Sequence, residues 1–130
     1  MVILGNLETP EIHGEIAIAL NTTLKFGLQD IDHPCCGNCG RIELLLVAAQ
    51  KLSRPELLET AQKQAAWVVA RTKQAGAFHL FPNLPKDVYN PSFFQGTAGI
   101  SYELLRLAYP NILPSVLLWD SNQKQVSTAQ

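Results

Sequence analysis

Apolar residues near the start of the chain recur every three or four positions, a spacing that predicts an amphipathic helix. Thr9-Pro10-Glu11 marks the start of this helix, because Thr caps helices, Pro fits the first turn, and an acid favours the positive end of the helix dipole. Gly27 marks its end. The single apolar stripe between these signals consists of Ile12, Ile16, Leu20 and Leu24.

The next apolar stretch is continuous rather than periodic. Residues 44–49 read LLLVAA and belong to a predicted helix over residues 41–52 that is apolar around most of its circumference. We expect other elements to enclose this helix. Asn38 is its expected N-cap, and the exposed N–H groups at its start favour anions in the residues just before it.

Two more helices follow. Ser53-Arg54-Pro55-Glu56 has the pattern of a capping box and opens a helix that runs to about Gln74. Residues 96–108 form the last helix, which Pro110 and Pro114 end. The apolar face of the longer, outward-facing helix consists of Leu58, Ala61, Ala65 and Val68.

The segment between these two helices, residues 76–95, carries three prolines and is not expected to be helical. A short strand is predicted at residues 77–81. After Asp120 the sequence turns polar, and residues 121–130 are predicted to be a disordered tail.

The predicted helices repeat in pairs. Gly37-Asn38-Cys39-Gly40 corresponds to Gly96-Thr97-Ala98-Gly99, and Thr9-Pro10-Glu11-Ile12 corresponds to Arg54-Pro55-Glu56-Leu57. Each unit is an outer amphipathic helix followed by a Gly-x-x-Gly turn into a more buried inner helix. Only two units are present, whereas such arrays need roughly three for stability, so the sequence predicts an all-α chain that is incomplete on its N-terminal side.

Composition narrows the function classes. The 130 residues are 47% hydrophobic and 16% charged with a formal net charge of −1, which suits one globular domain at most and excludes nucleic-acid binding through a basic surface. No apolar run is long enough to cross a membrane, and the start of the chain lacks the features of a signal peptide. We therefore expect a cytoplasmic protein, with no membrane span, that keeps its thiols reduced.

The candidate chemistry lies in His33-Pro34-Cys35-Cys36-Gly37-Asn38-Cys39-Gly40, which holds all three cysteines. Adjacent thiols such as Cys35 and Cys36 do not easily form a disulfide with each other, but both can face one metal ion. Buried or incidental thiols are the alternative. Cys39 is expected to be a small packed residue, because its counterpart in the second repeat is Ala98. His33 is expected in a solvent-exposed loop rather than as a fourth ligand.

Other polar residues receive no catalytic role. Glu43 and Glu103 are expected to make contacts on the helix surfaces or between helices. Phe93 and Phe94 are expected to pack the last helix against its neighbours, and either is a candidate for lining a peptide cavity.

Two motifs carry a resemblance to a known family. They are Cys35-Cys36-Gly37-Asn38-x-Gly40 and the longer, more specific run from Asn90 to Arg106 (NPSFFQGTAGISYELLR), followed by Leu113-Pro114-Ser115-Val116-Leu117. Together they closely resemble the C-terminal end of the cyclase (LanC-like) domain of class II lanthionine synthetases, over roughly Thr9 to Asp120. The resemblance implies an α/α toroid of alternating inner and outer helices, of which this chain holds about two pairs with a short β insert. It also implies a zinc ion at one end of the central cavity.

In that family the zinc ligands are one upstream Cys and a Cys-His pair followed by Gly. Here the pair is Cys35-Cys36, so the resemblance implies a three-thiolate site in which Cys36 replaces the usual His. A thiolate in place of a neutral imidazole adds negative charge to the Zn²⁺ shell, which should leave a zinc-activated substrate thiol more electron-rich.

The reaction implied is the addition of a Cys thiol of a precursor (lanthipeptide) peptide to dehydroalanine or dehydrobutyrine, which closes a thioether ring. The first zinc Cys and the proton-transfer residues of the family would lie before Met1. We therefore expect residues 1–130 to be a C-terminal cyclase fragment, inactive alone, with the missing N-terminal part of the synthetase as a candidate partner.

Two other function classes remain open. A noncatalytic helical-repeat module would bind peptides independently of Cys35 and Cys36. A thiol redox protein would use Cys36-Gly37-Asn38-Cys39 as a Cys-x-x-Cys motif and would form a reversible disulfide.

Overall fold

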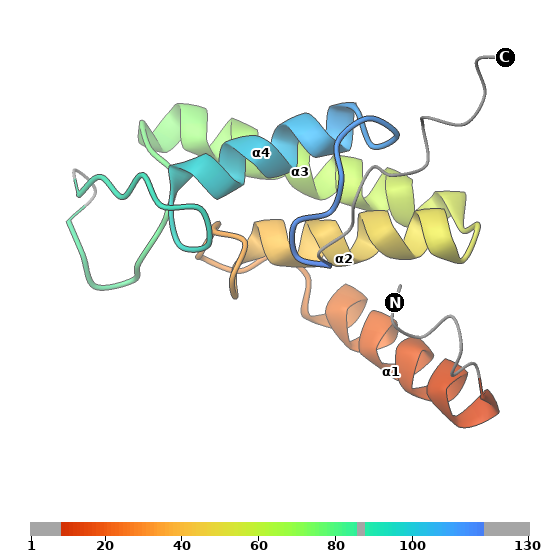
Figure 1. The fold of residues 1–130 in the computed structure, drawn as a ribbon. Helices are drawn as coiled ribbons and strands as arrows, with labels where there is room; N and C mark the ends of the chain where they lie inside the picture. The colour runs from red at the N-terminus through yellow and green to blue at the C-terminus, as the bar shows by residue number, and fades with distance from the viewer. Residues whose placement is uncertain (1–8, 86–87, 119–130) are drawn as a thin grey trace, which may run out of the picture.

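The computed structural model describes residues 9–85 and 88–118, and the described part is all-α, as predicted. It contains four helices: α1 (Pro10–Phe26), α2 (Asn38–Lys51), α3 (Pro55–Ala75) and α4 (Thr97–Ala108). Figure 1 shows α2 and α4 running in the same direction, with α3 antiparallel to them. This is the expected order of outer and inner helices in a fragment of a helical toroid. The predicted tail, residues 121–130, lies outside the described residues.

The outer helix α1 begins and ends at the residues that the sequence indicates, and α3 ends within one residue of its predicted end. The Oγ1 of Thr9 accepts a hydrogen bond from the backbone N–H of Ile12 at 3.3 Å and so caps α1. Gly27 ends α1 with a φ of 60°, and Gly76 ends α3 with a φ of 81°. Both values lie in the region that glycine adopts without a steric penalty, which explains the position of each stop.

Two predicted caps are wrong. Gly37, not Asn38, is the N-cap of α2, and Asn38 lies in the first turn with its side chain buried and bonded to the preceding loop. Ser53 lies outside α3 with a φ of 53°, and no side chain caps that helix. Arg54 instead donates to the carboxylate of Glu56 at 2.7 Å, which takes Glu56 away from the capping-box geometry.

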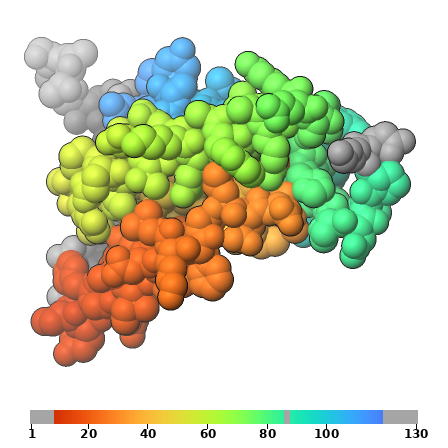
Figure 2. All heavy atoms as spheres, turned by 180° about the vertical axis from the view of Figure 1, so that it is seen from behind, coloured from red at the N-terminus to blue at the C-terminus, as the bar shows by residue number. Residues whose placement is uncertain are grey.

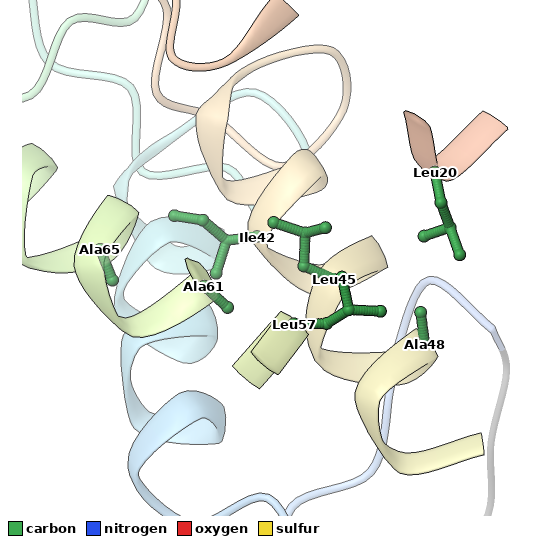
Figure 3. Close-up of a cluster of buried hydrophobic side chains, with 7 residues drawn as sticks. All are labelled: Leu20, Ile42, Leu45, Ala48, Leu57, Ala61 and Ala65. Carbon is green, nitrogen blue, oxygen red and sulfur yellow. The ribbon is translucent and has the colours of Figure 1, made fainter. Parts of the chain in front are cut away.

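The core lies between α2 and the outer helices. As predicted, α2 is enclosed: Ile42, Leu45, Leu46 and Ala48 have no exposed surface. Figure 3 shows side chains of α2 meeting those of α3, with one leucine from α1 at the edge. The cluster consists of Leu20, Ile42, Leu45, Ala48, Leu57, Ala61 and Ala65. In α3 the buried leucine is Leu57, whereas Leu58, assigned to the apolar face from the sequence, is only half-buried.

The helix α1 is attached less extensively than the others. It contacts α2 and no other helix among the described residues, and Leu20 is its one buried residue. Ile18 and Phe26 remain 67% and 65% exposed. Figure 2 shows α1 extending away from the body formed by the other helices.

The strand predicted at residues 77–81 is not observed, since the described residues contain helices, turns and irregular segments only. His79 accepts one backbone hydrogen bond from the N–H of Asp32 at 2.8 Å, but its own N–H goes to the Asp32 side chain at 2.9 Å. A carboxylate thus takes the place of a second strand, and no ladder forms.

The Gly-x-x-Gly turns at the starts of α2 and α4 lie 59 residues apart in the sequence. Their glycines have the same backbone surroundings. A Cβ placed on Gly37 would lie 2.5 Å and 2.6 Å from the carbonyl oxygens of His33 and Ile31. On Gly96 it would lie 2.5 Å and 2.3 Å from the oxygens of the corresponding residues, Ser92 and Asn90. The predicted repeat is therefore present in atomic detail, and no side chain fits at either glycine.

The second glycine of each turn is equally constrained. A Cβ on Gly40 would lie 2.2 Å from the carbonyl oxygen of Pro34, and one on Gly99 would lie 1.8 Å from that of Phe93. Each inner helix thus begins in direct contact with the carbonyls of its own preceding loop.

We expect Gly40→Ala to lower the free energy of unfolding by at least about 2 kcal/mol, because a backbone carbonyl cannot move aside as a flexible side chain would. The matched control is Gly14→Ala in α1, where nothing lies within 4 Å of the added Cβ. That change should stabilise the chain by ~0.5–1 kcal/mol. Urea unfolding followed by circular dichroism measures both, and equal effects would contradict the close contact.

Candidate functional site

The two adjacent thiols lie together at the surface, in the turn that leads into α2. Cys35 and Cys36 are exposed, whereas Cys39 has no exposed surface. An open pocket of about 290 Å³ lies beside the pair. It is lined by Pro34, Cys35, Cys36, Gly37, Gly40, Arg41, Leu44 and Leu117. The thiols are therefore accessible to a metal ion or to an external molecule.

Three N–H groups at the start of α2, those of Gly37, Asn38 and Cys39, are not free to bind the thiols, contrary to expectation. The N–H of Asn38 donates to the carbonyl of Ile31 at 2.8 Å, and the N–H of Cys39 donates to that of Asp32 at 3.1 Å. The N–H of Gly37, the N-cap, donates to His33 at 3.0 Å. Because carbonyls of the preceding loop accept these three hydrogen bonds, these N–H groups are not available to bind an anion at the thiols.

A buried carboxylate fixes the loop that carries the thiols. Asp32 has no exposed surface and pairs with the guanidinium of Arg71 from α3. Its Oδ1 also accepts from the amide of Asn38 at 2.9 Å, and its Oδ2 accepts from the N–H of His79 at 2.9 Å. One side chain therefore joins the thiol loop to α2, to α3 and to the segment that follows α3.

The loop before α4 supports the thiol turn from the other side. The N–H of Cys35 donates to the carbonyl of Phe94 at 2.9 Å. The ring of Phe93 packs on those of Phe94 and Tyr102, with centroids 5.3 Å and 5.6 Å away, so its ring contacts are to its own loop and to α4. Phe94 itself stays 47% exposed next to the thiols.

His33 is buried, with only 2% of its surface exposed, so the prediction of a solvent-exposed loop is wrong. Its ring packs on Phe81 with the centroids 5.9 Å apart, and its Nε2 lies 3.9 Å from the Sγ of Cys36. Burial holds the pKa of His33 below its usual value. Sequence reasoning missed this contact because Ser92, the counterpart of His33 in the second repeat, gives no hint of a buried ring.

Cys39 is a packed residue, as predicted. It lies in a cluster with Leu80 and Ile100, and burial raises the pKa of its thiol far above the usual range, with the charge of Glu103 adding to the effect. A buried thiol that resists ionisation is poorly suited to thiol–disulfide exchange, which weighs against the Cys36–Cys39 redox function.

A second polar cluster connects the two inner helices. The Nε of Arg106 donates to both carboxylate oxygens of Glu43 at 2.9 Å, and its guanidinium also donates to the carbonyl of Leu113 at 2.6 Å. Glu103 is 96% buried beside them, and burial, with the charge of Glu43 adding to it, raises its pKa to about 9. Of the two expected placements for these glutamates, the structure has the one between helices.

The donor set at the thiol pair suits zinc. Two thiols are soft ligands that zinc prefers, and both are exposed on one turn. In residues 9–85 and 88–118, no group of three or more His, Cys, Asp or Glu side chains is arranged to hold a metal ion. Within the described residues the pair is thus two soft donors without a third ligand beside them.

The comparisons with known proteins agree with the motifs. A family model described as lanthionine synthetase C-like protein matches residues 2–118, which include both Gly-x-x-Gly turns and the thiol pair. The searches of curated proteins and of solved structures gave no match. None of the helices in the described residues is long and apolar enough to span a membrane.

We expect Asp32→Asn to lower the free energy of unfolding by about 3 kcal/mol, because Arg71 then loses the partner that offsets its partial burial. The control is Glu59→Gln, which breaks the exposed Glu59–Lys63 pair of α3. That change should alter the free energy of unfolding by no more than ~0.5 kcal/mol. Urea unfolding compares the two, and a cost for Asp32→Asn as small as for the control would contradict the role of this carboxylate.

The buried Glu103 predicts a pH-dependent stability. Its pKa is about 9 in the folded chain against 4.5 normally, so between these values the folded chain holds a proton that the unfolded chain has released. The free energy of unfolding should therefore fall as the pH rises through this window, by up to about 1.4 kcal/mol per pH unit.

The test is urea unfolding of Glu103→Gln at a series of pH values. Glutamine is permanently neutral, so this variant should lack the component of the slope that Glu103 causes. Glu15→Gln, at an exposed position of α1, is the control and should keep the slope of the parent chain. A Glu103→Gln variant with an unchanged slope would show that Glu103 is not the group responsible.

Proposed function

The chain belongs to the lanthionine synthetase C-like protein family, and from this premise we propose that it is the C-terminal part of a zinc-dependent cyclase. Its substrate class is a precursor peptide that carries Cys together with dehydroalanine or dehydrobutyrine. The exposed Cys35–Cys36 pair beside an open pocket is the observation that supports this proposal.

The reaction is an addition in which no redox partner takes part. A sulfur–carbon bond forms between a peptide Cys and the β-carbon of the dehydro residue, the carbon–carbon double bond is lost, and a proton is added at the α-carbon. Zinc, when bound, would supply Lewis acidity that favours the ionised, nucleophilic form of the peptide thiol at neutral pH.

In this proposal Cys35 and Cys36 hold the metal, and the rigid turn around them fixes their position. The turn is held by the Asp32 network on one side and by the carbonyl of Phe94 on the other. The third protein ligand and the acid that supplies the proton come from outside the described residues. Reduced thiols are required, which favours the cytoplasm as the location.

The helix α1 supports the proposal that further helices complete the ring. Its side chains Ile18 and Phe26 are largely exposed, and α1 packs on α2 alone among the described helices. Apolar residues on the free side of an outer helix are what a neighbouring repeat would cover. An N-terminal part of a synthetase is the partner that we propose for this surface.

Zinc binding tests the function without requiring the missing acid. Zinc at about ten times its Kd leaves roughly one site in ten free, so alkylation of Cys35 and Cys36 should slow about tenfold. Mass spectrometry of the digested chain measures each thiol separately. Cys35→Ser and Cys36→Ser should each abolish the protection of the remaining thiol at the same zinc concentration.

The matched control is Cys39→Ala, which places in the first turn the residue that the second turn already has. This variant should bind zinc as the parent chain does. If zinc bound equally well after removal of both Cys35 and Cys36, the proposed metal site would be wrong.

A further inference from the structure

The imidazole of His33 lies in a site that determines which of its nitrogens carries hydrogen. The ring is buried, with 2% of the residue exposed, and its Nδ1 has no hydrogen-bond partner within the described residues. Its Nε2 faces the Sγ of Cys36 at 3.9 Å, within reach of a hydrogen bond to sulfur. The two nitrogens of this ring therefore have different surroundings.

Burial favours one tautomer of this ring. A buried N–H without an acceptor is rare in folded proteins, whereas a buried acceptor without a donor is less so. A hydrogen on Nδ1 would be left without an acceptor, but a hydrogen on Nε2 would point toward the sulfur of Cys36. The Nε2 hydrogen is present in the protonated ring as well, so this donor is available whether His33 is neutral or charged.

We propose that His33 is a positioning residue whose Nε2–H donates to the sulfur of Cys36. This contact makes the two thiols inequivalent. The sulfur of Cys36 lies against a buried ring that donates to it. Cys35, by contrast, is bonded through its backbone N–H among the described residues, so its sulfur is free to rotate.

The contact also changes the charge on the sulfur at the metal site, a consequence that rests on the proposed function. Cys36 occupies the position where the family has a His, so its thiolate adds a negative charge. An N–H donor to that sulfur draws electron density away from it and offsets part of the added charge. In this proposal the imidazole of His33 contacts the ligand sulfur, whereas in the family an imidazole is itself the ligand.

Nitrogen NMR of the ¹⁵N-labelled 130-residue chain tests the tautomer directly, without zinc. We expect His33 to show a protonated Nε2 and an unprotonated Nδ1 near neutral pH. Cys36→Ala should shift the Nε2–H resonance, and Cys35→Ala, the matched control, should leave it in place. A hydrogen on Nδ1, or a shift caused by the Cys35 change alone, would overturn the proposal.

Thiol alkylation provides a second readout. His33→Phe keeps a ring on Phe81 but removes the donor, so the released Cys36 should react faster relative to Cys35 when both thiols are ionised. A net hydrogen bond of about 1 kcal/mol corresponds to roughly a fivefold change in this ratio. His13→Phe, at an exposed position in α1, is the control and should leave the ratio unchanged.

The buried Cys39 reports whether the variant stays folded, because it becomes reactive only when the chain opens. An unchanged ratio of Cys36 to Cys35 with Cys39 still protected would overturn the proposal. If Cys39 became reactive in His33→Phe, the NMR result on the parent chain would decide. Neither readout uses zinc, so a failure of the metal site and a failure of this contact are distinguishable.

Discussion

A single buried carboxylate, that of Asp32, constrains the geometry of the whole thiol region. It receives hydrogen bonds from Asn38 in α2, from Arg71 in α3 and from the backbone of His79. Because a buried charge without partners is costly, these segments must arrive together for the chain to fold. The position of Cys35 and Cys36 relative to the outer helix is thus set by electrostatics a few residues away from the thiols.

Close packing of backbone supplies the second constraint. The glycines of both turns lie against carbonyl oxygens of their own loops, so each inner helix starts at a fixed distance from the chain that precedes it. The contact from the N–H of Cys35 to Phe94 then joins the two turns. The thiols therefore sit on backbone that is fixed from both sides, which is the preorganisation that a ligand site needs.

Much of the fold follows from local sequence signals. Thr9 and Gly27 mark real helix ends because their preferences are set within a few residues. The pairing of Cys39 with Ala98 correctly indicated a small packed residue. The family match likewise confirms the resemblance that the two motifs carry.

The errors arose where distant partners decide the outcome. Asn38 is a residue type that often caps helices, but here its side-chain amide donates a hydrogen bond to the buried Asp32. The segment around His79 alternates like a strand, but that same carboxylate takes its N–H. The ring of His33 packs on Phe81, which lies far along the chain, so no local sequence pattern indicates that His33 is buried.

The two turns share one backbone shape but carry different side chains. Where the first turn carries Cys35 and Cys36, the second carries Phe94 and Gln95 on equivalent backbone. Glycines and carbonyls specify this shape, so the pair of residues in the middle is free to vary without redesign of the scaffold. A repeated unit of this kind therefore provides two equivalent backbone positions for different side chains. The first turn presents two thiols there, and the second presents an aromatic ring and an amide.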